Sequence, residues 1–421
     1  MKIHKALSII LVLALVFAAG CVNKTVISNE PEDTLEGKIV IWGNKNSIEA
    51  LKLSAHNFSK LHAKVSIDFI EVDKDKLEEK LNACIDLKAN IPDIIAVEDE
   101  QVQSIIKDFK DNLKETGSSI KKEEYLKYKI KNLSLENKLY GIPFNSEPAV
   151  MLYRSDIFLK AGANAEYIKT YRDFIDKGKS IVKFTGKKMI AYSLEDDEVY
   201  RRMLNQLNQS YFDEDGKPLL NTPSAHRVLE NLKIFQEEEL VQRVGPSENI
   251  INIVKAEKAA AVIASPEDVF RVMKELTQFK GKLDIMKVPA FEEGGNQSIS
   301  LGGTNLMLLK SDIDENLLLE FAKFTTENKD NITSLISSTG FFPAYSYFYD
   351  EKWFQQGGNI LYSQLAKDIY TFNYTENFSK VVQSVQNAIG KIILAGEDIN
   401  ITMEALQKET EEIMKPEETL P

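Results

Sequence analysis

Short apolar runs and amphipathic stretches alternate along the chain after residue 36. Lys38–Trp42 and Val65–Ile70 are short runs rich in β-branched residues, and apolar residues recur at helical spacing between them over Ser47–Leu61. Leu77–Leu87 has the helical spacing again, and Asp93–Val97 is an apolar run that predicts a buried third strand. Strands that alternate with helices are typically joined by right-handed crossovers, so this pattern predicts an α/β fold with a largely parallel sheet.

The same alternation continues toward the C-terminal end. Further predicted strands are Ala149–Tyr153, Ala259–Ala264, Leu283–Val288 and the glycine-marked extended segment Ile299–Leu309. Further predicted helices are Ser155–Ala161, residues 170–182, residues 222–239, the segment opened by Ser265–Asp268, Leu317–Thr326, Asn377–Leu394 and Thr402–Met414. Thr170 precedes Asp173 by three residues, and Thr222 and Ser265 are each followed by proline, which is typical of helix N-termini.

The first twenty residues have a different pattern. Lys2 and Lys5 precede an uninterrupted apolar run over Ile9–Ala19, which is shorter than the roughly 20 residues that a membrane-spanning helix needs. A positive start, a short apolar run and small residues are typical of a secretory signal peptide, which we predict for residues 1–20. Residues 21–36 are mostly polar without periodicity, and they predict a flexible tether.

Cys21 directly follows the small residues Ala18-Ala19-Gly20. This arrangement resembles a bacterial lipobox, in which the cysteine is lipidated and begins the mature chain, although that pattern prefers leucine where Ala18 stands. A diacylated cysteine supplies the two acyl chains that stable anchoring requires. The sequence therefore predicts a lipid anchor at Cys21 on the extracytoplasmic face of the cell membrane. The alternative is an ordinary cleaved signal followed by a chance cysteine.

The composition narrows the class of protein. The chain has 421 residues, of which 43% are hydrophobic and 28% charged, and a net charge of −12. This is enough apolar material for two or three domains, and it excludes disorder over most of the chain. An acidic surface repels phosphate, which argues against a general nucleic-acid binder. Two cysteines exclude a disulfide framework, and Cys84 is predicted to pack as a small buried hydrophobe.

A search for catalytic motifs finds none in the sequence. There is no G-x-S-x-G, H-E-x-x-H or P-loop lysine motif, and His56 and His62 are six residues apart instead of four. In the acidic stretch Asp213–Gly216, Tyr211 would stand at the first ligand position of a calcium loop, so we predict a hairpin turn. No carboxylate pair stands out among the 64 acidic residues. We therefore predict a protein that is not an enzyme and uses no metal or cofactor, with glycoside hydrolysis by a carboxylate pair as the open alternative.

Four segments, in order, resemble the extracellular solute-binding proteins of ABC transporters, the family 1 group that includes maltose-binding proteins. The third segment is the most specific, because it follows a pattern of Tyr-Gly-Ile-Pro, a strand, Tyr-x-x-Asp-x-Phe-x-x-Ala-Gly and Thr-aromatic. The four segments are Lys38–Asn44, Ile91–Ile95, Leu139–Pro143 continuing through Tyr153–Gly162 to Thr170-Tyr171, and Leu317–Thr326 with Gly340–Ala344. Leu394–Gly396 and Glu404–Leu406 fit the family's last pair of helices.

The resemblance implies a two-lobed α/β fold of the periplasmic-binding-protein type II, with hinge strands between the lobes. The first lobe would comprise residues 37–145 and 297–343, and the second residues 146–296 and 344–415. The resemblance also implies that the lobes close on a sugar or oligosaccharide, which is then delivered to the transmembrane subunits of an ABC permease. We expect a monomer that binds a small-molecule solute and no nucleic acid.

Candidate site residues lie just after the predicted strands, because ligands of open α/β sheets bind beyond the carboxyl ends of the strands. This rule points to Asn44, Lys45, Glu98, Asp99 and Glu100. The resemblance implies the same region. Asn44 and Lys45 stand where a relative has an acid and a lysine that bind sugar hydroxyls, and Glu100 stands at another acidic position. The aromatic residue and the arginine of that second loop are absent from this chain.

Further candidates follow from the resemblance. Glu147 matches an acid that contacts ligand, and Asn145 lies in the same hinge segment; a solvated turn carboxylate is the alternative for Glu147. Asp196 and Tyr200 lie in the region of an acid and a tyrosine that bind sugar, with the register left open. Glu267 stands where the family has a stacking tryptophan, so it could contact ligand or only complement the positive N-terminus of a helix.

Replacement aromatic residues are the weakest part of the predicted site. Phe341 is the first candidate, with Phe342, Tyr345 and Trp353 beside it, and each could equally belong to the core. Sugar sites combine planar hydrogen-bonding groups with aromatic platforms, and here the hydrogen-bonding groups are better represented. The excess of acids leaves a cationic ligand open. A surface hydrolase acting on carbohydrate through a carboxylate pair, and an adhesion lipoprotein without a solute, are the competing hypotheses.

Overall fold

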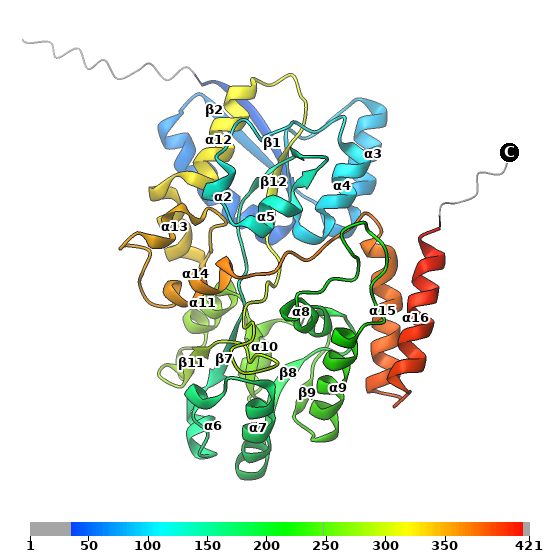
Figure 1. Cartoon of the computed structure of the whole chain (residues 1–421). Coiled ribbons are helices and arrows are strands. Elements are labelled where there is room, and N and C mark those ends of the chain that lie inside the picture. Colours follow the sequence, from blue (N-terminus) through cyan, green and yellow to red (C-terminus); the bar gives the residue numbers. More distant parts are fainter. Residues whose placement is uncertain (1–34, 247, 416–421) are drawn as a thin grey trace, which may run out of the picture. The chain divides into compact units, whose positions relative to one another are not determined.

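The computed structural model describes residues 35–246 and 248–415 of the chain. The predicted signal peptide, Cys21 and most of the predicted tether lie outside these residues. From Glu36 onward the chain forms one compact unit, which contains two five-stranded sheets (Figure 1). Among the described residues, no helix combines the length and apolar character needed to cross a bilayer.

The first sheet has the strand order β2-β1-β3-β12-β6. Its strands are β1 (Gly37–Gly43), β2 (Val65–Glu71), β3 (Ile94–Glu98), β6 (Ile142–Pro143) and β12 (Thr304–Leu308). The helices of this half are α2 (Lys45–Leu61), α3 (Leu77–Leu87), α4 (Val102–Phe109), α5 (Lys127–Asn132), α12 (Glu315–Glu327) and α13 (Lys329–Thr339). Three short 3₁₀ turns and a small hairpin complete it: η1 (Lys74–Lys76), η2 (Asp99–Gln101), η3 (Lys122–Glu124), β4 (Ser134–Leu135) and β5 (Lys138–Leu139).

The second sheet has the strand order β11-β7-β10-β8-β9. Its strands are β7 (Val150–Arg154), β8 (Lys188–Tyr192), β9 (Val241–Arg243), β10 (Ala259–Ala264) and β11 (Leu283–Met286). Its helices and turns are α6 (Ser155–Lys160), η4 (Ala165–Tyr167), α7 (Tyr171–Thr185), α8 (Glu198–Gln206), α9 (Pro223–Glu237), α10 (Ile250–Lys255), α11 (Pro266–Glu275) and η5 (Thr277–Phe279). The C-terminal part adds η6 (Ser346–Asp350), α14 (Asn359–Lys367), α15 (Phe378–Ile393) and α16 (Ile399–Ile413), of which α15 and α16 pack against α9.

The expectation of a largely parallel sheet is wrong. Each sheet has two parallel and two antiparallel pairings, because β12 runs against β3 and β6, and β7 runs against β10 and β11. The reason is the path of the chain. It leaves the first sheet after β6, builds the second sheet from β7 onward, and returns to the first as β12. A strand that enters a sheet from the other half runs opposite to the strands that point toward that half.

Local signals located several helices well. Thr170 and Asp173 form the reciprocal capping box of α7, and Ser265 and Asp268 form that of α11. Thr222 caps α9, with Pro223 at its first position. The bounds predicted for α3 and β10 agree with the structure. The acidic stretch after Phe212 is a hairpin turn, as predicted, since the Asp213 N–H donates to the Lys217 carbonyl.

Three stretches of chain near residues 145, 301 and 343 run side by side between the two sheets. The Ser146 N–H donates to the Phe342 carbonyl (2.9 Å), and the Glu147 N–H donates to the Gly302 carbonyl (3.2 Å). Gly303 has a φ of +146°, and a Cβ there would lie 2.7 Å from the Asn145 carbonyl oxygen. This close approach requires glycine. The lobe boundaries predicted from the sequence stay a prediction.

Cys84 differs from its predicted role. It lies on α3, where Leu77 and Leu81 are the buried positions, and its own side chain is only half-buried as a free thiol. The prediction of a buried cysteine was therefore wrong, because position 84 stands beside the buried stripe of this helix and not within it. In the part of the chain that the structure describes, no cluster of His, Cys, Asp and Glu side chains is arranged to hold a metal ion.

Candidate functional site

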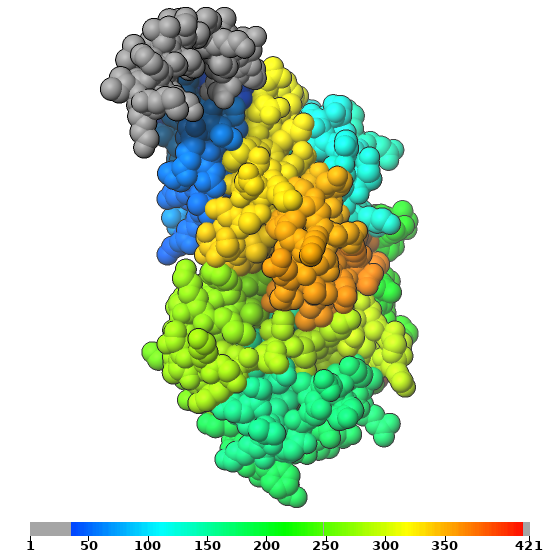
Figure 2. Space-filling view, turned by 90° about the vertical axis from the view of Figure 1, so that its left-hand side faces the viewer, coloured from blue at the N-terminus to red at the C-terminus, as the bar shows by residue number. Residues whose placement is uncertain are grey.

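Two adjoining cavities lie between the first sheet and the second, with volumes of about 720 Å³ and 300 Å³. The residues that line both include Asn46, Ala50, Glu147, Glu198, Arg202 and Glu267. The cavities therefore form one continuous cleft. The larger cavity lies where α2 and α13 of the first half meet α10 and α11 of the second, and Figure 2 shows this face of the molecule. Both volumes lie near the range of small-molecule sites.

The first sheet contributes Asn44 and Glu98 to the cleft. β1 ends at Gly43, and Asn44 caps α2 by accepting the Ser47 N–H at 2.9 Å. This orients the amide so that Nδ2 donates to Glu98 Oε1 at 2.6 Å. Burial raises the pKa of Glu98, while the hydrogen bond from Asn44 acts in the opposite direction. The two side chains thus come from adjacent strands and hold each other in the cleft wall.

Glu147 lies in the hinge segment and lines both cavities. Its side chain is enclosed by both halves but keeps contact with solvent through the cleft. Burial raises the pKa of Glu147 well above its ordinary value, and the carboxylates of Glu267 and Glu98 push the pKa in the same direction. Among the described residues, no cation forms an ion pair with it. Glu147 is thus a carboxyl group whose charge the protein does not compensate.

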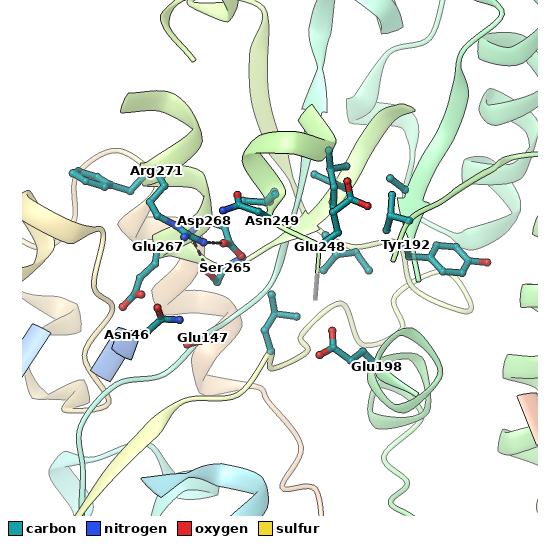
Figure 3. Close-up of a pocket in the computed structure, with 18 of the residues that line it drawn as sticks. Asn46, Glu147, Tyr192, Glu198, Glu248, Asn249, Ser265, Glu267, Asp268 and Arg271 are labelled. Atoms are coloured by element: carbon teal, nitrogen blue, oxygen red, sulfur yellow. Dashed lines mark hydrogen bonds and ion pairs between the residues drawn. The ribbon is translucent and has the colours of Figure 1, made fainter. Parts of the chain in front are cut away.

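Glu267 reaches the same place from the second sheet. Ser265 and Asp268 make the capping box of α11, so the Glu267 side chain is not needed for it and lines both cavities instead. Figure 3 shows Glu267, Asn46 and Glu147 together on one side of the larger cavity. Burial and the neighbouring Asp268 raise the pKa of Glu267 to about 7, despite the opposing effect of Arg271. Glu98, Glu147 and Glu267 therefore form a cluster of carboxyl groups at the centre of the cleft, which we call the central glutamates.

Glu100 stands in a different environment at one end of the smaller cavity. Its Oε1 accepts from Lys74 Nζ at 2.9 Å, and its Oε2 accepts from Arg201 Nη1 at 3.0 Å. Burial by itself would raise the pKa of Glu100, but the two cations outweigh it and lower the pKa to about 2. Glu100 is therefore ionised and fully paired, in contrast to the central glutamates.

Eight of the predicted site residues line the cleft. Those that line the smaller cavity are Asn44, Glu98, Asp99, Glu100, Asn145, Glu147 and Glu267. Asp196 lines the larger cavity, where burial and the neighbouring Glu198 raise its pKa. Asn145 lies at the hinge, where its Oδ1 accepts the Thr304 N–H. The structure thus brings together side chains from five separate stretches of sequence.

Three predicted site residues lie elsewhere. Lys45 is exposed at the first position of α2 and does not line either cavity; the next residue, Asn46, does so instead. Tyr200 is 1% exposed, because it lies on the side of α8 that packs into the apolar core beside the second sheet. Phe341 is also 1% exposed and packs on Phe144, with ring centroids 4.8 Å apart.

The aromatic rings in the smaller cavity were not predicted. Tyr370, Phe372 and Tyr374 alternate along the segment between α14 and α15 and line this cavity. Asn205 of α8 fixes the segment, because its Nδ2 donates to the Tyr370 carbonyl at 3.0 Å. The Tyr-Thr-Phe-Asn-Tyr alternation was a visible signal, but no family motif marks it. Lys74 of η1 and the two arginines of α8, Arg201 and Arg202, also line this cavity and were not predicted.

Known proteins resemble this chain in both sequence and fold. The profile of the bacterial extracellular solute-binding protein family matches residues 54–361. The chain belongs to this family. Among curated relatives, the arabinooligosaccharide-binding protein of Bacillus subtilis is 28% identical over 286 residues, 66% of this chain and 66% of that protein. The lactose-binding protein of Rhizobium radiobacter is 25% identical over 68% of this chain and 69% of that protein.

Solved structures of similar fold include the GacH receptor of Streptomyces glaucescens and the sugar-binding protein MalE from Xanthomonas citri. The first has a TM-score of 0.77 at 15% identity and covers 90% of this chain and 99% of its own. The second has a TM-score of 0.78 at 14% identity, covering 90% and 97%. At these identities the likeness shows the fold, which is the two-lobed α/β fold of solute-binding proteins. The family and these relatives are binding proteins rather than enzymes.

Proposed function

We propose that the chain is the extracellular receptor of an ABC importer and binds an oligosaccharide in the cleft. The observation that carries this proposal is the composition of the cleft. Its centre holds amide and carboxyl groups from both sheets, and the aromatic segment with Tyr370 and Tyr374 forms part of its wall. A sugar ring has a polar rim and apolar C–H faces, so it needs both kinds of group. The names of the curated relatives, which bind arabinooligosaccharides and lactose, support this substrate class.

Within this proposal, the side chains in the cleft have different roles in binding the solute. Asn44, Asn46 and Asn145 offer amide donors and acceptors, and the central glutamates accept from sugar hydroxyls or, when protonated, donate to them. Asp196 serves the part of the solute in the larger cavity. Lys45, Tyr200 and Phe341 have no direct role, because none of them lines the cleft.

We also propose how the receptor works in the cell. The lobes, residues 37–145 with 297–343 and residues 146–296 with 344–415, close on the solute by bending at the three hinge stretches. The closed form is what the transmembrane subunits of the permease recognise. A lipid on Cys21 holds the monomeric protein at the outer face of the membrane, and residues 22–36 give it reach. Turnover of the bound solute is not part of the proposal, and the competing surface hydrolase has no support from the family or its relatives.

A thermal-shift titration tests the proposed function. The mature chain would be screened against arabinooligosaccharides, galactooligosaccharides, maltooligosaccharides and lactose, each beside its monosaccharide. We expect one oligosaccharide class to raise the melting temperature in a concentration-dependent way, because a ligand that binds only the folded state stabilises it by mass action. The same mixtures are analysed by chromatography for products. Absence of any shift across the panel, or release of shortened sugars, would overturn the proposal.

A further inference from the structure

The ion pair between Glu100 and Arg201 joins the two halves of the molecule. Glu100 is in η2, directly after β3 of the first sheet, whereas Arg201 is in α8, which packs into the apolar core beside the second sheet. Nη1 of Arg201 lies 3.0 Å from Oε2 of Glu100, and the two side chains are 12% and 26% exposed. Both residues line the smaller cavity, so the pair also forms part of its wall.

Each side chain of this pair also has an interaction partner within its own half. Glu100 is also paired with Lys74 at 2.9 Å, and the backbone of Lys74 is fixed by Gln101, whose Nε2 donates to its carbonyl at 2.7 Å. On the other side, Nε of Arg201 lies 3.4 Å from Oδ2 of Asp197. The guanidinium also lies over the ring of Phe378, 5.2 Å from its centroid. Both charged groups are therefore positioned before they meet.

This double pairing makes the contact reversible. A buried charge that loses its sole partner is strongly destabilising. Here, separation of the two halves leaves Glu100 with Lys74 and Arg201 with Asp197, so neither charge is left without a partner. Asp197 is itself fixed, because the hydroxyl of Tyr211 donates to its Oδ2 at 2.7 Å in a buried position. The contact can thus open and close without disturbing either half.

Other ion pairs between the halves of the described chain are more exposed, as two examples show. Lys107 and Glu376 lie 2.7 Å apart with side chains 57% and 38% exposed, and Lys131 and Glu214 lie 3.3 Å apart at 52% and 86%. Pairs of this kind contribute little because water screens them. The Glu100–Arg201 pair is screened less and has prepositioned partners, so it contributes more to closure than either of them.

We propose that Glu100 and Arg201 form an internal latch that favours the closed arrangement before any solute arrives. The part that concerns the empty receptor stands independently of the proposed function. Its consequence for solute affinity rests on that function: if the closed form is the one that binds tightly, the apparent dissociation constant rises as the closed fraction falls. Arg201 is then a positioning residue, which acts on the solute through the closure of the two halves.

The test measures closure in the empty protein by pulsed electron paramagnetic resonance. Nitroxide labels would be attached through Lys52→Cys on α2 and Lys160→Cys on α6, which are exposed positions in the two halves, in a Cys21→Ser, Cys84→Ser background. Glu100→Gln and Arg201→Met each remove one charge of the latch while keeping most of the side-chain shape. We expect each variant to lower the ratio of short-distance to long-distance populations about tenfold.

Lys131→Met serves as the matched control, since it removes the exposed pair with Glu214 and changes the net charge by the same amount as Arg201→Met. It should leave the distance distribution unchanged. Melting temperatures of all variants verify that they are folded. Identical distributions for the wild type, Glu100→Gln and Arg201→Met would overturn the latch, and so would an equal shift in Lys131→Met. No sugar is present, so a negative sugar panel would count against the proposed function alone.

Discussion

The centre of the cleft and its latched end use the same side-chain chemistry in opposite ways. Both contain glutamates that are largely removed from bulk water. At the latched end, Lys74 and Arg201 surround Glu100 and lower its pKa to about 2. At the centre, burial raises the pKa of Glu147 well above its ordinary value and that of Glu267 to about 7, with no paired cation to offset it fully.

The glutamates of this cleft thus differ in whether the protein itself compensates their charge. A carboxylate that already has two cations satisfies its charge within the protein and stabilises an arrangement of the chain. Carboxyl groups that crowd one another without such partners raise the free energy of the empty site, and hydrogen-bond donors on a solute can lower it again. Under the two proposals above, Glu100 therefore serves closure, whereas Glu147, Glu98 and Glu267 serve recognition.

The largest expected effect is at Glu147. Glu147→Ala removes a hydrogen-bonding group from the middle of the cleft and leaves its solute partner unsatisfied, which typically costs about 1–3 kcal/mol. We expect an oligosaccharide identified by the panel to bind roughly tenfold to a hundredfold more weakly in isothermal titration calorimetry. Glu79→Ala, on the exposed face of α3, is the matched control and should bind as the wild type does. Unchanged affinity in Glu147→Ala would remove the centre from the proposed binding site.

The next largest effect is the pH dependence that Glu267 gives to the stability of the folded chain. Because its pKa of about 7 in the folded chain exceeds that of the unfolded chain, near 4.5, folding becomes less favourable as the pH rises through this interval. Glu267→Gln cannot ionise and should equal the wild type in stability below pH 4.5. Above pH 7 it should be more stable by about 2 kcal/mol, less than the roughly 3 kcal/mol of the full shift because the side chain is only half-buried in the cleft. Urea unfolding from pH 4 to 8 measures this. If the difference in stability between the two proteins does not change with pH, folding does not raise the pKa of Glu267.

Glu100 should show the opposite dependence. Its pKa is about 2 in the folded chain against about 4.5 when unfolded, so its contribution is present above pH 4.5 and is lost as the pH falls toward 2. Since its side chain is 26% exposed, we expect Glu100→Gln to lose about 1.5 kcal/mol at pH 7. Unfolding curves should converge with the wild type in acid. A gain of stability at neutral pH would reverse the comparison between the two ends of the cleft.

The sequence predicted local features of the chain better than features that depend on the path of the chain between the sheets. Capping residues and apolar periods are local, so Thr170, Thr222 and Ser265 located their helices correctly. The rule for strand ends and the family resemblance also pointed to Asn44 and Glu147. Strand direction was not local: β12 and β7 run antiparallel to neighbours because of the route of the chain between the sheets. The pattern of apolar residues does not indicate which route the chain takes between the sheets.

The latch could not be predicted for a related reason. Arg201 lies 101 positions from Glu100 in the sequence, and each looks like an ordinary charged residue of an acidic chain. Only the fold brings them together. Lys45 and Phe341 lie outside the cleft for a local reason. The strand-end rule and a family position pointed to Lys45, and Phe341 was a candidate replacement for a missing aromatic residue, but neither inference includes the local geometry. The turn of α2 directs Asn46 to the cleft instead of Lys45, and Phe341 is needed to pack on Phe144.

The smallest expected effect concerns the aromatic segment that lies beside the latch. If Tyr370 provides a platform for a sugar face, Tyr370→Ala should weaken oligosaccharide binding about fivefold, or about 1 kcal/mol, whereas Tyr370→Phe should retain most of the affinity because the ring remains. Tyr347→Ala, at a position 57% exposed and away from the cleft, is the control. Isothermal titration calorimetry on the three variants measures these oligosaccharide affinities. Equal losses in the alanine and phenylalanine variants would point to the hydroxyl group, and the latched end would then recognise solute by hydrogen bonding, as the centre does.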